Sequence, residues 1–214
     1  MNILKLDKIS FSYDGKKYVL KDYSCSFERG KIYAIVGKSG AGKTTLLSLL
    51  AGLDKVSDGQ ILYDGNDISS INRYSYRNSN VGVIFQNYNL LPKLTAKENV
   101  ELSMEISKKK IKNKHSRAVE LLNKVGLLSD EIDRRVLKLS GGQQQRVAIA
   151  RALSFEPDII LADEPTGNLD PETQNEILKI FKKIAQEDNK CVIVVTHSKS
   201  VAQEADVVYE LKKL

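Results

Sequence analysis

The sequence has few of the residues that mark disulfide-rich, metal-binding or membrane-spanning proteins. It contains two cysteines in 214 residues, Cys25 and Cys191, and both lie in strand-like stretches. They form neither a disulfide framework nor a metal-binding spacing. The longest apolar runs, such as residues 191–195, have the length of a strand and fall short of the ~18 residues of a membrane span. The start of the chain lacks a signal-peptide core. We therefore expect a reduced, soluble domain.

Aromatic residues are absent from residues 89–154, although this stretch carries most of the net positive charge. Residues 104–124 hold five of the six net charges, through Lys108, Lys109, Lys110, Lys112, Lys114, Arg117 and Lys124 against two acidic residues. Nucleic-acid sites usually combine basic groups along a face with stacking aromatics. We interpret the segment as a solvated basic turn, with anionic lipid as its possible neighbour, in preference to a nucleic-acid site. No nucleic-acid partner is expected.

The hydrophobic pattern predicts an α/β fold with a mostly parallel core sheet. Short runs rich in Ile and Val suit strands covered on both faces, at residues 32–36, 81–85, 159–162 and 191–195, with a last strand at 207–211. Helical periodicity and end signals predict helices at residues 43–51, 95–106, 116–125, 143–154 and 171–186. Residues 1–27 read as strands joined by a turn at Asp14-Gly15, which predicts an N-terminal antiparallel β subdomain.

A glycine-rich loop follows the strand at 32–36 and precedes the helix at 43–51. It reads Gly37-Lys38-Ser39-Gly40-Ala41-Gly42-Lys43-Thr44 and matches the P-loop pattern G-x-x-x-x-G-K-[ST], in which backbone N–H groups and the helix start surround phosphate oxygens. Lys43 would contact the β- and γ-phosphates, and the Thr44 hydroxyl would ligate Mg²⁺. We assign residues 37–44, with the adjacent Thr45, to the binding of a nucleoside triphosphate.

The strand signal disappears between Phe85 and Ile159. A block of about 70 residues is too long for a simple crossover, so we expect an inserted helical subdomain. We therefore expect one domain over residues 1–214. Residues 1–86 and 158–214 would form the nucleotide-binding core with its β subdomain, and residues 87–157 the helical subdomain.

Two adjacent carboxylates, Asp163 and Glu164, follow the strand at 159–162. Successive strand residues face opposite ways, so the two can take different roles. Asp163 would help to hold Mg²⁺, and Glu164 would polarise the attacking water as general base. If the P-loop is left out of consideration, the alternative is that the two carboxylates are N-caps for the following turn.

A second anion-binding helix start is predicted at Ser140-Gly141-Gly142-Gln143. The alternative is a serine cap with a flexible joint, and the residues alone favour neither. Two phosphate-binding segments nearly a hundred residues apart are unusual in one chain.

The ordered set of motifs resembles the ATP-binding cassette of ABC transporters over essentially the whole chain. The resemblance rests on the P-loop, on Leu139-Ser140-Gly141-Gly142-Gln143 and on residues 160–165, Ile-Leu-Ala-Asp-Glu-Pro. It implies a head-to-tail dimer in which each ATP lies between the P-loop of one copy and the Ser140–Gln143 segment of the other. It also implies a separate membrane permease as partner and a peripheral position on the cytoplasmic face of the cell membrane.

The resemblance implies four further site residues. Tyr13 would stack on adenine, with Phe11 or Tyr18 as alternatives. Gln86 would sense the γ-phosphate and Mg²⁺, and His197 would contact the γ-phosphate. Asp170 would lie in the loop that connects the two sites of a dimer; by itself it would be only a helix cap before Pro171. The other histidine, His115, lies in the basic segment and reads as a surface residue.

Residues 85–100 and 165–170 look like the branch that contains macrolide exporters, lipoprotein-release ATPases and antimicrobial-peptide resistance transporters. This implies ATP-driven export or extraction of a peptide, a lipid-linked molecule or an antibiotic. In that branch the permease would dock on the segment after Gln86, although Leu90, Leu91 and Leu94 could instead be core residues. The alternatives are a cell-division-type ATPase that signals to cell-wall hydrolases, an amino-acid uptake system, and a nucleic-acid-linked ABC ATPase.

Overall fold

Two β-sheets organise the part of the chain that the structure describes, which is residues 2–107 and 109–214 of a computed structural model. The larger sheet is parallel, with strand order β6-β7-β8-β3-β9. Its strands are β3 (Ile32–Gly37), β6 (Val81–Ile84), β7 (Ile159–Asp163), β8 (Cys191–Val195) and β9 (Val207–Leu211). The smaller sheet is antiparallel, with order β2-β1-β4-β5. It contains β1 (Asn2–Ser12), β2 (Tyr18–Glu28), β4 (Asp58–Tyr63) and β5 (Asn66–Asp67).

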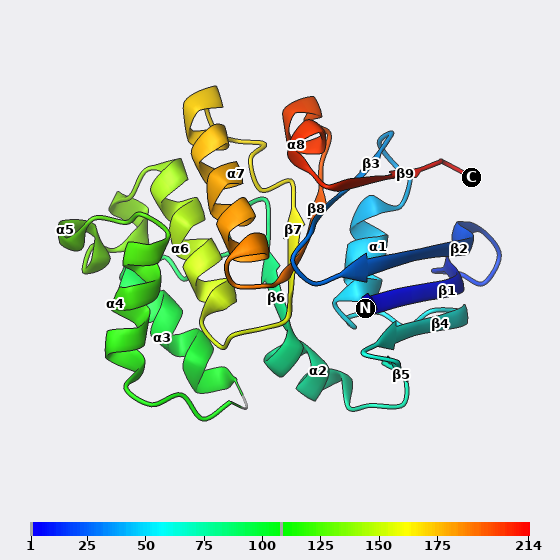
Figure 1. The fold of residues 1–214 in the computed structure, drawn as a ribbon, viewed down its shortest axis with the longest axis horizontal. Coiled ribbons are helices and arrows are strands. Elements are labelled where there is room, and N and C mark those ends of the chain that lie inside the picture. Colours follow the sequence, from blue (N-terminus) through cyan, green and yellow to red (C-terminus); the bar gives the residue numbers. More distant parts are fainter. Residues whose placement is uncertain (1, 108) are drawn as a thin grey trace.

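Helices cover both faces of the parallel sheet (Figure 1). Between the two sheets lies α1 (Lys43–Leu50), while α7 (Pro171–Gln186) and α6 (Gly141–Leu153) lie on the opposite face. The group of helices farthest from the antiparallel sheet also contains α3 (Ala96–Ile106), α4 (Lys114–Lys124), α5 (Ser129–Ile132) and the 3₁₀ turn η1 (Val136–Lys138). The remaining helices are α2 (Arg73–Asn80), before β6, and α8 (Lys199–Glu204), before β9.

The alternation of side chains along the central strands divides the core in two. In β7, Ile160 and Ala162 pack with the helices α3, α4, α6 and α7. Ile159 and Leu161 pack with α1 and the antiparallel sheet. Because successive strand residues face opposite ways, a run of consecutive apolar residues supplies both cores at once.

The structure confirms most of the elements that the sequence predicts. The predicted bounds of α7, β8 and β9 are reproduced, and α6 begins two residues earlier than the periodicity indicates. The sequence pattern predicts no strand or helix for residues 52–80, where the structure has β4, β5 and α2. In β4, Asp58, Gly59 and Gln60 are exposed, so this strand lacks the alternating pattern that identifies a half-buried strand. None of the helices in the described residues combines the length and apolar character that a membrane crossing needs.

Candidate functional site

A cavity of about 530 Å³ lies at the carboxyl ends of β3, β7 and β8, beside the start of α1. This is the edge of an open parallel sheet at which ligands bind in α/β proteins. The residues that line it include most of the predicted site and are Val19, Ser39, Gly40, Gly42, Lys43, Thr44, Thr45, Gln86, Asp163, Glu164, Val195 and His197. The fold thus brings together residues from five separate parts of the sequence.

Lys43 is almost completely buried and lies inside the loop that precedes it. Its Nζ donates hydrogen bonds to the carbonyl oxygens of Gly37, at 3.0 Å, and Lys38, at 3.4 Å. It also lies 3.1 Å from Nε2 of His197. An ammonium has three donors and no acceptor, so Nε2 of His197 accepts from Lys43 and the ring proton lies on Nδ1. The predicted phosphate-binding lysine and the predicted γ-phosphate histidine are therefore in contact.

Glycine is required at Gly42, the N-cap of α1. The residue has a φ of 92°, in the left-handed region that side chains disfavour. A Cβ at this position would also lie 2.9 Å from Cγ1 of Val19. The loop can therefore pass this close to β2 and continue into α1 only if residue 42 has no side chain.

The two carboxylates after β7 have different surroundings. Oδ2 of Asp163 accepts a hydrogen bond from the Thr44 hydroxyl at 3.4 Å. Burial raises the pKa of Asp163, and the neighbouring Glu164 carboxylate raises it further, against the lowering effect of Thr44 and Lys43. Glu164 has a φ of 44°, a strained conformation for a residue with a side chain. Strain of this kind is found at functional sites where the surrounding contacts enforce it.

Glu164 is held by the residues that follow β8. Its Oε2 accepts hydrogen bonds from the backbone N–H of His197, at 3.1 Å, and from the Thr196 hydroxyl, at 3.3 Å. Its other oxygen, Oε1, is buried without a hydrogen-bond partner among the described residues, although Nε2 of His197 lies 3.4 Å away. Because Lys43 donates to Nε2, that nitrogen has no proton to offer, and Oε1 remains available as an acceptor.

The residues predicted to hold Mg²⁺ supply oxygen ligands from α1, from β7 and from the turn after β6. Thr44 and Asp163 are in contact, and Gln86 lines the same cavity. Within the described residues, no group of three or more His, Cys, Asp or Glu side chains is arranged to hold a metal by itself. Mg²⁺ is usually bound by one or two carboxylates together with substrate phosphates, so this sparse oxygen set fits that ion.

Tyr13 lies at the end of the antiparallel sheet, next to the start of α1. Its hydroxyl is 3.0 Å from Oγ1 of Thr45, and the edge of one ring meets the face of the other in its contact with Phe11. The side chain is 70% exposed. Tyr13 is not among the residues that line the cavity, so its stacking on adenine stays a prediction; of the alternatives, Phe11 is buried and Tyr18 is 42% exposed.

The predicted second phosphate-binding segment lies apart from this cavity. In the described residues, Ser140–Gln143 do not line it. They form the start of α6, where the Ser140 hydroxyl accepts from the Gln143 N–H at 3.3 Å and the Gln143 side chain accepts from the Ser140 N–H at 2.7 Å. Gly141 is exposed and Gly142 partly so. Asp170 is also outside the cavity, where it caps α7 through Thr173, whose hydroxyl donates to it at 2.6 Å.

Three residues at the site, Val19, Val195 and Thr196, were not identified from the sequence. Thr196 holds Glu164 and Val19 packs on the glycine-rich loop. Thr196 follows β8 directly, and its place at the carboxyl end of a buried strand was a usable signal. Val19 lies in β2, and its proximity to the loop depends on how the two sheets are arranged.

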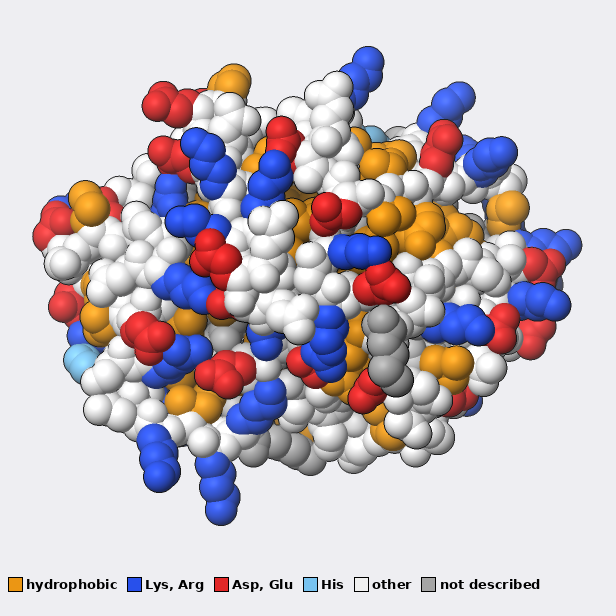
Figure 2. All heavy atoms as spheres, viewed as in Figure 1, with side chains coloured by type: hydrophobic (Ala, Val, Ile, Leu, Met, Phe, Trp, Pro, Cys, Tyr) orange, Lys and Arg blue, Asp and Glu red, His pale blue; other side chains and the backbone are white. Residues whose placement is uncertain are grey.

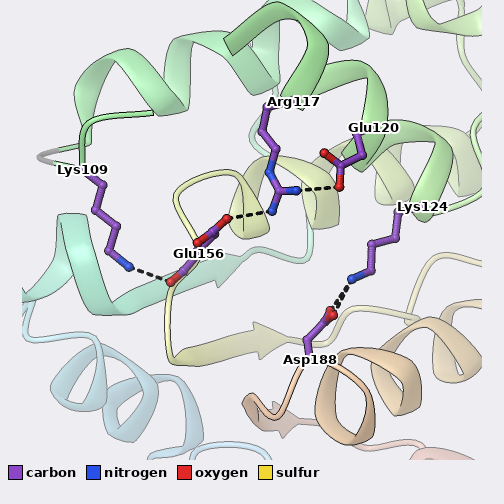
Figure 3. Close-up of polar contacts among 6 residues, drawn as sticks. All are labelled: Lys109, Arg117, Glu120, Lys124, Glu156 and Asp188. Carbon is purple, nitrogen blue, oxygen red and sulfur yellow. Dashed lines mark hydrogen bonds and ion pairs between the residues drawn. The ribbon is translucent and has the colours of Figure 1, made fainter. Parts of the chain in front are cut away.

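The basic segment is engaged in contacts with acidic residues and carbonyl groups of the neighbouring loops (Figure 3). Lys109 donates to the carbonyl oxygen of Glu156 at 2.7 Å, and Arg117 pairs with the Glu156 carboxylate at 3.0 Å. Lys124 pairs with Asp188 at 2.5 Å. These loops precede β7 and β8, so the contacts lie at the end of the sheet opposite the cavity.

Lys108, which the basic segment includes, lies outside the described residues. Lys114 pairs with Glu105 at 2.6 Å. Figure 2 shows Lys and Arg side chains interspersed with Asp and Glu side chains over one face of the molecule. The pairing and the mixed charge support the interpretation of this segment as a solvated surface.

Comparison with known proteins identifies the family. Residues 20–167 match the family described as ABC transporter. The chain is 47% identical over its whole length to an uncharacterized ABC transporter ATP-binding protein, YclH, of Bacillus subtilis, and covers 95% of that protein. It is 42% identical over 90% of its length to the lipoprotein-releasing system ATP-binding protein LolD 2 of Rhodopirellula baltica, 79% of which is covered. It is 41% identical over 91% of its length to the macrolide export ATP-binding/permease protein MacB of Syntrophobacter fumaroxidans, but covers only 28% of that longer protein.

Solved structures confirm the predicted fold. The dimeric bacterial ABC transporter cassette MJ0796 superposes with a TM-score of 0.87 and 38% identity, over 98% of this chain and 94% of the other. A structure of the same cassette in a post-hydrolysis state, bound to ADP and phosphate, gives the same TM-score at 36% identity. The P-loop cavity, the acidic pair and these relatives lead to one conclusion: the chain belongs to the ATP-binding proteins of ABC transporters and is an ABC ATPase.

Proposed function

We propose that this chain drives a separate membrane permease that exports or extracts a peptide, a lipid-linked molecule or an antibiotic, from a peripheral position on the cytoplasmic face of the membrane. The observation that supports hydrolysis most directly is the convergence of Lys43, Thr44, Asp163, Glu164 and His197 on one cavity. The cargo class is supported by residues 85–100 and by the resemblance to LolD and MacB.

In this proposal the P-loop holds the phosphates of ATP. The N–H groups of residues 37–44 and the Lys43 ammonium would contact phosphate oxygens. Thr44, Asp163 and Gln86 would hold Mg²⁺, which when bound neutralises charge that develops on the phosphates. Lys43 has all three donors engaged, so it would exchange at least one of these partners for phosphate.

Glu164 is the proposed general base. Oε2 is fixed by Thr196 and by the N–H of His197, which orients the carboxylate. The unpartnered Oε1 would be the atom that accepts a proton from water, once ATP binding opens this buried oxygen to a water molecule. A positioned base of this kind typically contributes about 10²–10⁴-fold to the rate. His197 lies between Lys43 and Glu164, so its contact with the γ-phosphate would change the surroundings of both residues.

The Ser140–Gln143 segment would serve a second copy of this chain. It is an exposed helix start outside the cavity of its own copy, and the related cassette MJ0796 is dimeric. We propose a head-to-tail dimer in which this segment closes on the ATP of the partner. Asp170 would lie near the connection between the two sites, and Tyr13 would stack on adenine.

The permease would dock beside the segment that follows Gln86. A hollow of about 310 Å³ lies there, and its lining includes Leu53, Phe85, Asn89 and Arg151. Leu53, which lines the hollow, is 49% exposed, and Leu91, in the segment after Gln86, is 46% exposed. Apolar groups around an open groove favour contact with another protein.

A pull-down tests the proposal. The Glu164→Gln variant, with Mg-ATP, is used to capture partners from detergent-solubilised native membranes, with Glu187→Gln as control because Glu187 is exposed at the end of α7. A permease with few spans and a large extracytoplasmic domain, enriched by Glu164→Gln alone, supports the proposal.

Three other results would contradict parts of it. A permease with many spans and a binding protein would point to uptake. A complex with a regulator of cell-wall hydrolases, with a septation defect on depletion, would point to signalling. Recovery of only DNA or ribosomes would remove the transport function.

A further inference from the structure

The segment from Phe85 to Asn89 lies between the ATP cavity and α6. Gln86 lines the cavity, while Phe85 and Asn89 line the hollow proposed for the permease. Tyr88 lies between these contacts in the sequence and packs, partly buried, against the core of the helical group. One short segment therefore reaches both proposed sites and the helical subdomain.

The backbone of this segment is held in a conformation that it would not adopt alone. Tyr88 and Asn89 have φ values of 60° and 49°, and left-handed residues with side chains are uncommon and costly. Arg151, in the last turn of α6, donates to the carbonyl oxygen of Tyr88 at 2.8 Å and also to that of Asn89. The strained pair of residues is thus fixed to the C-terminal end of α6.

The hydroxyl of Tyr88 lies close to the opposite end of the same helix. A Cβ on Gly141, the first residue of α6, would lie 3.1 Å from the Tyr88 hydroxyl. Gly141 and Arg151 are separated by about 15 Å along an α-helix. Tyr88 therefore lies beside α6 near both ends: its carbonyl oxygen accepts a hydrogen bond from Arg151, and its hydroxyl lies close to Gly141.

We propose that Tyr88 is a positioning residue that couples the Gln86 segment to the Ser140–Gln143 start of α6. When the segment is displaced on its permease side, Tyr88 moves with it. The side chain that lies against Gly141 is then displaced as well. The start of α6 is then correctly placed for the partner's ATP only while the strained Tyr88–Asn89 conformation is kept. The inference rests on the proposed head-to-tail dimer.

The test separates ATP binding by one copy from ATP-dependent dimerisation. In the Glu164→Gln background, Tyr88→Ala and Arg151→Ala should weaken the ATP-bound dimer by about 10-fold, the scale of coupling through packed contacts. Their affinity for ATP at concentrations where the chain is monomeric should stay within about 2-fold, because neither residue lines the cavity. Tyr74→Ala, an exposed tyrosine of α2, is the matched control.

A double-mutant cycle distinguishes positioning from general damage. Gly141→Ala should weaken the dimer, because the added methyl group would lie against the Tyr88 hydroxyl. Tyr88→Phe removes that hydroxyl and should restore at least part of the lost dimer affinity. If the two substitutions acted independently, their fold-losses in dimer affinity would multiply. Thermal melting of every variant checks that the fold is retained.

Each alternative result overturns a defined part of the argument. If the Tyr88 and Arg151 variants dimerise as well as Glu164→Gln alone, or if monomer ATP affinity falls in parallel, the coupling role is wrong. If Tyr88→Phe fails to relieve Gly141→Ala, the hydroxyl contact has no role. If Glu164→Gln itself forms no ATP-dependent dimer, the proposed dimer fails first.

Discussion

The ammonium of Lys43 lies 3.1 Å from Nε2 of His197, although the two residues are 154 positions apart in the sequence. Lys43 follows β3 and His197 follows β8, and these strands are neighbours in the parallel sheet. His197 also lies 3.4 Å from Glu164. One imidazole ring therefore stands between the proposed phosphate-binding cation and the proposed catalytic base, where a bound phosphate would alter both contacts.

Replacing Lys43 by alanine is expected to weaken ATP binding by about 10- to 100-fold, because hydrogen bonds to charged groups contribute about 1.5–3 kcal/mol. Isothermal titration with ATP measures the change. Lys55→Ala provides the control, since Lys55 is an exposed lysine outside the cavity. Full affinity in Lys43→Ala would contradict the phosphate role of this side chain.

Thr196 is expected to act on catalysis through the orientation of Glu164. Thr196→Ala removes one hydrogen bond to Oε2 and should lower kcat by about 3- to 10-fold, since such a bond contributes about 0.5–1.5 kcal/mol. KM should be almost unchanged, because the hydroxyl contacts the base and not the P-loop. Thr196→Ser keeps the hydroxyl and should be close to the parent; an equal loss in both variants would show that the methyl group, and not the hydrogen bond, is important.

Asp158 is expected to make stability depend on pH. Burial tends to raise its pKa, but hydrogen bonds from Arg29, at 2.5 Å, and Tyr63, at 2.6 Å, outweigh this and hold the pKa below its ordinary value. A carboxyl group whose pKa is lower in the folded state than in the unfolded state stabilises the folded state at pH values above the unfolded pKa of about 3.9. This stabilisation is lost as the pH falls through the pKa of the folded state. Asp158→Asn should therefore lower the free energy of unfolding at pH 7 by about 1–2 kcal/mol, allowing for partial exposure.

Urea unfolding between pH 3 and pH 7 measures this effect. The difference between Asp158→Asn and the parent should shrink below about pH 4. Asp133→Asn is the control, because Asp133 is a carboxylate whose side chain is 71% exposed. A difference that is constant with pH would mean that Asp158 acts by shape and hydrogen bonding without its charge.

Much of the site could be predicted because each of its sequence motifs lies within a short stretch of the chain. The P-loop combines a strand, a glycine-rich turn and a helix start within residues 32–50, and Asp163 and Glu164 follow a strand of consecutive apolar residues. The roles of Tyr13, Gln86, Asp170 and His197 came from the resemblance to ABC cassettes, and these roles remain predictions. Thr196 was missed although it follows a buried strand directly, because that position alone does not show which side chain it contacts.

The sequence by itself determined the elements whose hydrophobic period, caps and turns are local, such as α7 with Asp170 as its cap and the loop that begins at Gly37. Tertiary structure alone decided which of these elements meet. It placed Lys43 against His197, Tyr88 against both ends of α6, and Ser140 outside the cavity. The physical reason is that local signals depend on a few neighbouring residues, whereas these contacts depend on strand order and on the packing of helices distant in the sequence.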